Sequence, residues 1–213
     1  MIDKYTHLIW DFNGTLLNDV DACIQSANAL LGAHGLPTLP SREQYQALFG
    51  FPVIDYYRRL GFDFSTTPFS ILAVEWVDYY NHYSRSSALY DEVTELLPQI
   101  RDMGIGQYIL SATETSMLER QVTALGIGKY FDELLGTDDI HAHGKAERGI
   151  AWRRMHPEAK PLLVGDTDHD AAVATAMGAD FVLFAGGHQS EERLLACKPI
   201  RVLHKLSDLL DLL

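Results

Sequence analysis

Short apolar runs alternate with amphipathic segments along the second half of the chain. Runs typical of buried strands lie at residues 106–112, 131–137, 160–166 and 180–187, with a weaker run at 199–203. Segments with helical spacing of apolar residues lie between and after them, at 116–127, 145–155, 169–179, 190–198 and 205–213. Strands that alternate with helices indicate a parallel sheet with helices on both faces.

The first half of the chain has a different pattern. An apolar strand is predicted at residues 5–11, and the following segments show helical spacing at 19–35, 41–50, 52–61 and 70–85 without a convincing strand. The first strand must therefore pair with strands far downstream. We predict an α/β fold, a Rossmann-like parallel sheet sandwiched by helices. Its core domain comprises residues 1–17 and 89–213, and a helical domain of residues 18–88 is inserted into it.

Composition narrows the class of partner. The chain has 213 residues and a net charge of −12, with no Lys/Arg-rich run, so nucleic acid is not expected as a partner. No signal pattern and no apolar run long enough for a membrane helix are found, so we expect a cytoplasmic protein that does not bind a membrane. Cys23 and Cys197 lie far apart without metal-ligand spacing, which favours two reduced thiols over a disulfide or zinc site.

Polar side chains follow or end the predicted strands. Asp11 ends the first strand, Ser111 lies at the end of the second, Lys145 follows the third after a loop, and Asp166 ends the fourth, with Asp170 close behind. In open parallel sheets, ligands bind beyond the carboxyl ends of the strands. Carboxylates suit Mg²⁺, and lysine and serine side chains can hold phosphate oxygens. The set therefore predicts a magnesium and phosphate site.

These residues resemble the four motifs of the haloacid dehalogenase-like hydrolase superfamily, in its phosphoglycolate phosphatase-like branch. The matching positions, in chain order, are Asp11-Asn13-Thr15, Ser111, Lys145 and Gly165–Asp170. The order and spacing of the motifs are kept, and the match covers almost the whole predicted core. Residues 18–88 fall where this branch inserts a helical cap domain. The resemblance implies a Mg²⁺-dependent phosphatase of small phosphorylated metabolites.

The resemblance also implies metal ligands. Asp11 is expected to be both the nucleophile and a Mg²⁺ ligand, and Asn13 is expected to offer its backbone carbonyl to the metal. Asp166 is expected to be the other protein carboxylate on Mg²⁺. Asp170 is expected to support it, either directly or through water.

The remaining motif residues are expected to bind phosphate. Ser111 and Lys145 would hold the phosphoryl group, and Lys145 would also orient Asp11. Gly14 and Ala112 complete the predicted phosphate site. Thr15 is expected to hold its loop rather than to touch substrate.

Asn13 departs from the family pattern, which has a second acid at this position. In the family's phosphatases this acid protonates the leaving alcohol and then activates water, help that is worth about 10²–10⁴ in rate. A neutral amide does neither. Three outcomes follow: a slow or restricted enzyme, a proton supplied by another residue such as one from the cap, or deamidation of the Asn13-Gly14 dipeptide to aspartate.

Two other functions stay open at this point. A metal-independent haloacid dehalogenase-type hydrolase fits Asn13 but not the acidic fourth motif. A low-turnover phosphoacceptor or binding protein would keep a phosphoryl group on Asp11, because the hydrolytic step lacks its base.

Several neighbouring residues are interpreted without a catalytic role. Asp168 is predicted to cap a helix, and His141 and His143 are predicted to be exposed loop residues. Phe49, Gly50 and Arg58 lie where related enzymes place a specificity loop, and contact with substrate there is a hypothesis.

Overall fold

The core of the fold is one parallel β-sheet. The computed structural model describes residues 4–137 and 144–213. Within them, six parallel strands form one sheet in the order β5-β4-β1-β6-β7-β8. The strands are β1 (His7–Trp10), β4 (Gly106–Glu114), β5 (Glu133–Thr137), β6 (Pro161–Gly165), β7 (Asp180–Phe184) and β8 (Val202–Leu203). The first strand therefore pairs with β4 on one side and β6 on the other.

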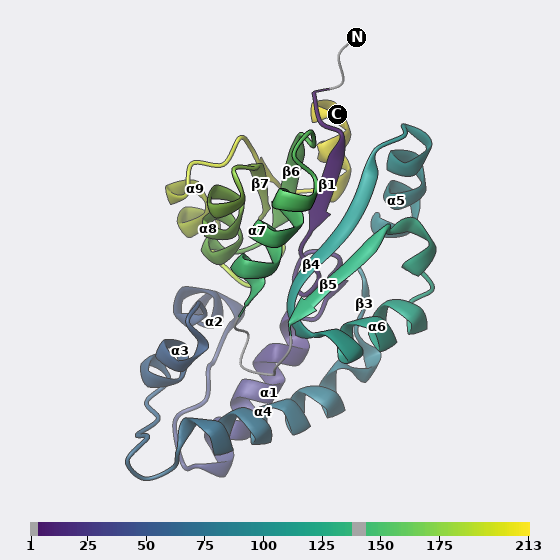
Figure 1. The fold of residues 1–213 in the computed structure, drawn as a ribbon. Coiled ribbons are helices and arrows are strands. Elements are labelled where there is room, and N and C mark those ends of the chain that lie inside the picture. Colours follow the sequence, from purple (N-terminus) through teal and green to yellow (C-terminus); the bar gives the residue numbers. More distant parts are fainter. Residues whose placement is uncertain (1–3, 138–143) are drawn as a thin grey trace.

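Helices cover both faces of the sheet (Figure 1). One face packs against α5 (Val93–Asp102), α6 (Thr115–Ala124) and the 3₁₀ helix η3 (Leu206–Leu212). The other packs against α7 (Lys145–Met155) and α8 (Asp168–Met177), with α9 (Glu191–Ala196) beside α8. Strand β1 is apolar on both sides for this reason: Trp10 joins the first layer and Ile9 the second.

The helical insert lies beyond the carboxyl ends of the strands (Figure 1). It consists of α1 (Val20–Ala33), α2 (Arg42–Leu48), α3 (Val53–Arg59), α4 (Phe69–Tyr83) and the 3₁₀ turn η1 (Ser84–Ser86). Its buried apolar residues form a hydrophobic cluster of their own. An antiparallel pair, β2 (Leu17–Asn18) and β3 (Ala88–Leu89), joins the two connections between insert and sheet. The division into domains at these positions stays a prediction.

The α/β fold with a parallel sheet is confirmed, and most predicted elements are found with shifted ends. Helix α5 was not predicted, because Pro98 lies inside it and proline is typical of helix interruption. The run at 199–203 contributes only two strand residues, and the C-terminal helix is a 3₁₀ helix. A second 3₁₀ turn, η2 (Gly128–Tyr130), precedes β5.

Within residues 4–137 and 144–213, no helix combines the length and the apolar composition that crossing a membrane requires.

Candidate active site

Four elements bring polar side chains to the carboxyl edge of the sheet. Asp11 directly follows β1, Ser111 lies in β4, Lys145 begins α7, and Asp166 directly follows β6. All four residues are buried. They meet because β1 lies between β4 and β6, a neighbourhood set by strand order and not by distance along the chain.

Lys145 joins two aspartates. Its Nζ donates to Asp11 Oδ1 at 2.5 Å and to Asp170 Oδ1 at 2.6 Å. Burial alone would lower the pKa of Lys145, but the two carboxylates raise it, so the ammonium stays charged. The pKa of Asp11 is raised well above its usual value by burial, and repulsion from Asp170 and Asp166 adds to the shift against the attraction of Lys145. The cluster holds more buried negative charge than one lysine neutralises.

Asp166 is fixed from both sides. Its Oδ1 accepts a hydrogen bond from Thr15 Oγ1 at 3.0 Å, and its Oδ2 accepts one from the backbone N–H of His188 at 2.7 Å. Burial raises the pKa of Asp166 to about 6, with repulsion from Asp170 adding to it. Thr15 thus connects the first motif to the fourth.

Gly14 makes room for Asp166. A Cβ at position 14 would lie 2.4 Å from Asp166 Oδ2, and Gly14 has a φ of +76°. Glycine alone adopts this conformation without strain and without a clash. The turn after Asp11 can therefore press its backbone against the Asp166 carboxylate.

The start of α8 orients Asp170. Thr167 is the N-cap residue, and its side chain accepts from the backbone N–H of Asp170 while Asp170 Oδ2 accepts from the backbone N–H of Thr167. This reciprocal arrangement is a capping box. The prediction that Asp168 caps the helix is wrong: Asp168 is the first helical residue, and its carboxylate accepts from Arg193 at 2.7 Å.

The donor set of this cluster fits a hard divalent cation. Asp11, Asp166 and Asp170 each offer a carboxylate oxygen, and these oxygens lie within 4.8 Å of one another. Oxygen ligands and a small number of carboxylates suit Mg²⁺. Within the described residues, Asp11 Oδ2 has no hydrogen-bond partner, whereas the oxygens of Asp170 are occupied by Lys145 and the helix cap.

The predicted phosphate-binding residues lie together. Ser111, Ala112 and Lys145 line one cavity with Asp11. Ser111 Oγ accepts from the backbone N–H of Thr113 at 3.1 Å, so its own hydroxyl hydrogen is directed elsewhere. The predicted set is thus gathered at one edge of the sheet, with Gly14 in the turn beside it.

The side chain of Asn13 has a full set of protein partners. Its Nδ2 donates to Asp19 Oδ2 at 2.7 Å and to Tyr80 Oη at 2.8 Å, and its Oδ1 accepts from Thr113 Oγ1 at 2.7 Å. Aspartate at this position would place a second carboxylate against Asp19, and like charges at this distance repel strongly. The neutral amide is matched to the buried Asp19 carboxylate.

Comparison with known proteins agrees with this geometry. The sequence profile of the haloacid dehalogenase-like hydrolases matches residues 8–184. This chain belongs to the haloacid dehalogenase-like hydrolase family. The predicted resemblance is confirmed, and the chain is a hydrolase.

Relatives of this haloacid dehalogenase-like hydrolase include named phosphatases. A pyrophosphatase PpaX from Anoxybacillus flavithermus is 24% identical, covering 97% of this chain and 95% of the relative. A phosphoglycolate phosphatase from Rhodobacter capsulatus is 25% identical, covering 85% of each chain. A solved haloacid dehalogenase-like hydrolase from Streptococcus pneumoniae has the same fold, with a TM-score of 0.85 at 19% identity over 99% of both chains.

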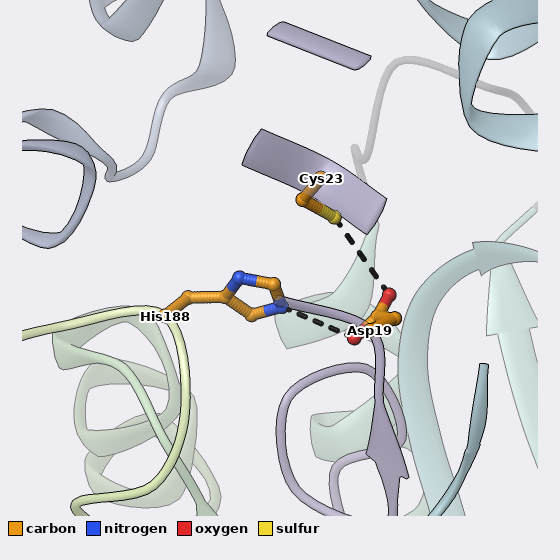
Figure 2. Close-up of side chains that lie close together, drawn as sticks. All are labelled: Asp19, Cys23 and His188. Atoms are coloured by element: carbon orange, nitrogen blue, oxygen red, sulfur yellow. Dashed lines mark hydrogen bonds and ion pairs between the residues drawn. The ribbon is translucent and has the colours of Figure 1, made fainter. Parts of the chain in front are cut away.

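This family member carries a second buried cluster, shown in Figure 2, which the sequence did not reveal. His188 Nε2 lies 3.4 Å from Asp19 Oδ1, and Cys23 Sγ lies 3.8 Å from Asp19 Oδ2. Asp19 and Cys23 are one helical turn apart at the start of α1, whereas His188 comes from the loop after β7. The spacing of Asp19 and Cys23 is visible in the sequence, but nothing in it pointed to His188.

The second cluster is best described as an internal ion pair. Burial would raise the pKa of Asp19, but hydrogen bonds from His188, Asn13 and Tyr80 lower it. Burial would lower the pKa of His188, but Asp19 raises it. The three side chains lie close enough to hold one metal ion. Burial and Asp19 raise the pKa of the Cys23 thiol, which favours its protonated form beside the ion pair.

A cavity of about 200 Å³ lies in front of the family motifs. Site residues from the sheet edge line one side, and aromatic residues of the insert line the other. Phe49, one of the residues predicted to contact substrate, lines it; Gly50 and Arg58 are not among its described lining residues, and Arg58 pairs with Asp55. The prediction for His141 and His143 lies outside the described residues.

Proposed function

We propose that this hydrolase is a Mg²⁺-dependent phosphatase of small phosphorylated metabolites, with Asp11 as nucleophile and α1–α4 as its cap. The position of Asp11 carries the proposal. Lys145 holds one carboxylate oxygen, the other has no hydrogen-bond partner in the described chain, and the cavity begins at this residue. The phosphatase names of the relatives support the same chemistry.

The first step transfers the phosphoryl group to Asp11. Asp11 Oδ2 attacks phosphorus, a P–O bond to the carboxylate forms, and the P–O bond to the leaving group breaks while the leaving oxygen takes a proton from water. Lys145 and Ser111 hold the phosphoryl oxygens, and the fixed charge of Lys145 stabilises the transition state. Water then attacks phosphorus, releasing inorganic phosphate and restoring the Asp11 carboxylate.

Asp11, Asp166 and the backbone carbonyl of Asn13 would hold Mg²⁺, with Asp170 supporting them. When bound, the cation supplies positive charge that offsets the repulsion between the carboxylates and the substrate phosphate. The raised pKa values of Asp11 and Asp166 support this assignment, because their causes are burial first and then repulsion from neighbouring carboxylates, and a bound cation would offset both.

Asn13 would limit the second step. Both hydrogens of its amide are donated to Asp19 and Tyr80, so the side chain neither gives nor takes a proton. Without general-base help the aspartyl-phosphate is expected to be hydrolysed slowly, and a phosphorylated form of the enzyme should accumulate during turnover.

The test uses p-nitrophenyl phosphate with the full chain. We expect hydrolysis that requires Mg²⁺ and is abolished in Asp11→Asn, with an Asp11 phosphoprotein visible by intact mass in the wild type only. Asp102→Asn, an exposed change on α5, is the matched control and should keep full activity. Hydrolysis that persists in Asp11→Asn or in excess EDTA would refute the proposal.

A further inference from the structure

The side of the cavity that faces the insert is apolar and largely aromatic. We call this surface the apolar subsite, formed by Phe49, Phe51, Val53, Trp76, Val77 and Met117. All six side chains are half-buried, so each keeps part of its apolar surface uncovered. Covering such a surface with an apolar group of a ligand removes apolar area from water and favours binding.

The apolar subsite adjoins the catalytic residues directly. The Trp76 ring stacks on the Tyr80 ring with centroids 5.1 Å apart and planes 12° apart. Tyr80 in turn accepts a hydrogen bond from Asn13, two residues from the proposed nucleophile. A substrate whose phosphate lies at Asp11 therefore places its leaving group against this surface.

No unpaired cationic side chain lines the cavity among the described residues. Lys145 is the one lysine or arginine there, and it is already paired with Asp11 and Asp170. His188 also lines the cavity, but its ring is paired with the Asp19 carboxylate, which raises the pKa of His188. Residues 138–143 contain neither lysine nor arginine. The lining does include a further carboxylate, Glu114, at the end of β4. An anionic leaving group would lose its hydration here without gaining a cationic partner.

The size of the cavity limits the ligand further. Its 200 Å³ must hold the phosphoryl group as well as the leaving group, and it is below the range of drug-sized ligand pockets. A cavity of about 150 Å³ accommodates benzene, so the leaving group is limited to about the size of one aromatic ring.

We propose that the apolar subsite selects phosphate esters with an uncharged, mainly apolar leaving group the size of one aromatic ring. This inference rests on the proposed phosphatase function. The proposed substrates differ from those named for the relatives, a pyrophosphatase and a phosphoglycolate phosphatase, because phosphate and glycolate are anionic leaving groups.

A matched pair of substrates tests the charge preference. Benzyl phosphate and 4-carboxybenzyl phosphate differ by one carboxylate remote from the reacting atoms, so their intrinsic reactivity is nearly equal. We expect kcat/KM for benzyl phosphate to be at least about tenfold higher. Phosphoglycolate and pyrophosphate should be hydrolysed less efficiently than benzyl phosphate.

Two variants test the location. Val77→Lys places a cation in the apolar subsite and should shift the ratio of the two kcat/KM values toward 4-carboxybenzyl phosphate by about tenfold or more. Trp76→Ala should lower kcat/KM for benzyl phosphate more than for methyl phosphate. Tyr83→Ala, which removes a half-buried aromatic ring of the same helix outside the cavity, is the control and should leave all ratios unchanged.

The outcomes separate the two proposals. Equal or faster hydrolysis of the carboxylate-bearing substrates, or an unchanged ratio in Val77→Lys with normal folding by circular dichroism, overturns the apolar subsite and leaves the phosphatase proposal standing. Absence of hydrolysis for every ester, including p-nitrophenyl phosphate, overturns both.

Discussion

At the scale of single residues, Asn13 is explained by its neighbour Asp19. The family position calls for an acid, but the surrounding hydrogen bonds call for a donor: Asn13 Nδ2 lies 2.7 Å from Asp19 Oδ2. Asp19 is fully buried and its pKa is lowered by the hydrogen bonds that surround it, so it is a carboxylate at neutral pH. The motif residue and the buried acid form a matched pair.

Asn13→Asp is therefore expected to destabilise the protein. It exchanges a hydrogen bond to a carboxylate for a contact between two carboxylates, at a cost of about 1–3 kcal/mol in the free energy of unfolding at pH 7. Urea denaturation in EDTA measures the change. Asn81→Asp, an exposed position on α4, should have little effect.

The double variant Asn13→Asp/Asp19→Asn restores one acid and one amide. We expect it to recover part of the stability lost in Asn13→Asp, because the contact again joins a donor to a carboxylate. Recovery is incomplete, because Asp19→Asn removes the carboxylate that pairs with His188. If Asn13→Asp alone were as stable as the wild type, the matched pair would not explain position 13.

At the scale of elements, helix α8 sets the direction of an active-site carboxylate. The capping box between Thr167 and Asp170 satisfies backbone donors of the first turn and leaves Asp170 Oδ1 for Lys145. The acidic fourth motif is thus both a helix start and part of the candidate site. The prediction of Asp168 as the cap was wrong by one residue, because Thr167 is the N-cap residue and Asp170 completes the capping box.

Thr167→Ala should weaken both roles. Loss of the cap is expected to lower the free energy of unfolding by about 0.5–2 kcal/mol. It should also lower kcat, because Asp170 Oδ2 loses the hydrogen bond from the Thr167 hydroxyl, which orients the carboxylate toward Lys145. Thr167→Ser keeps the hydroxyl and is the control; equal losses in both variants would show that the cap is not the cause. Denaturation and p-nitrophenyl phosphate kinetics report the two effects.

At the scale of the whole molecule, folding concentrates negative charge. The sheet order brings Asp11 and Asp166 together from distant segments, and α8 adds Asp170, while Lys145 is the lysine that enters this cluster among the described residues. Burial, together with repulsion from neighbouring carboxylates, raises the pKa values of Asp11 and Asp166, which means that their charged forms are destabilised. A cation that binds only the folded state should therefore stabilise the molecule as a whole.

Mg²⁺ is expected to raise the thermal midpoint of the wild type. A concentration of 100 times Kd corresponds to about 2.7 kcal/mol of stabilisation. The shift should be much smaller in Asp166→Asn, whereas Asp168→Asn, a change at an acid outside the carboxylate cluster, should keep it. Scanning calorimetry with and without EDTA measures it, and an equal shift in wild type and Asp166→Asn would contradict the metal assignment.

The sequence by itself determined the alternating elements, the parallel sheet and the motif residues, because strand periodicity and residues at strand ends are local properties. Helix α5 was not predicted, because Pro98 opposes its amphipathic pattern. The helix forms nevertheless, because its apolar residues pack against the sheet. Tertiary structure alone decided what surrounds those motif residues. His188 contacts Asp19, which lies 169 positions earlier in the chain. The apolar subsite lines the same cavity as Asp11 because the insert folds over the sheet edge. Contacts between segments so far apart leave no periodic pattern in the sequence, so the sequence did not predict them.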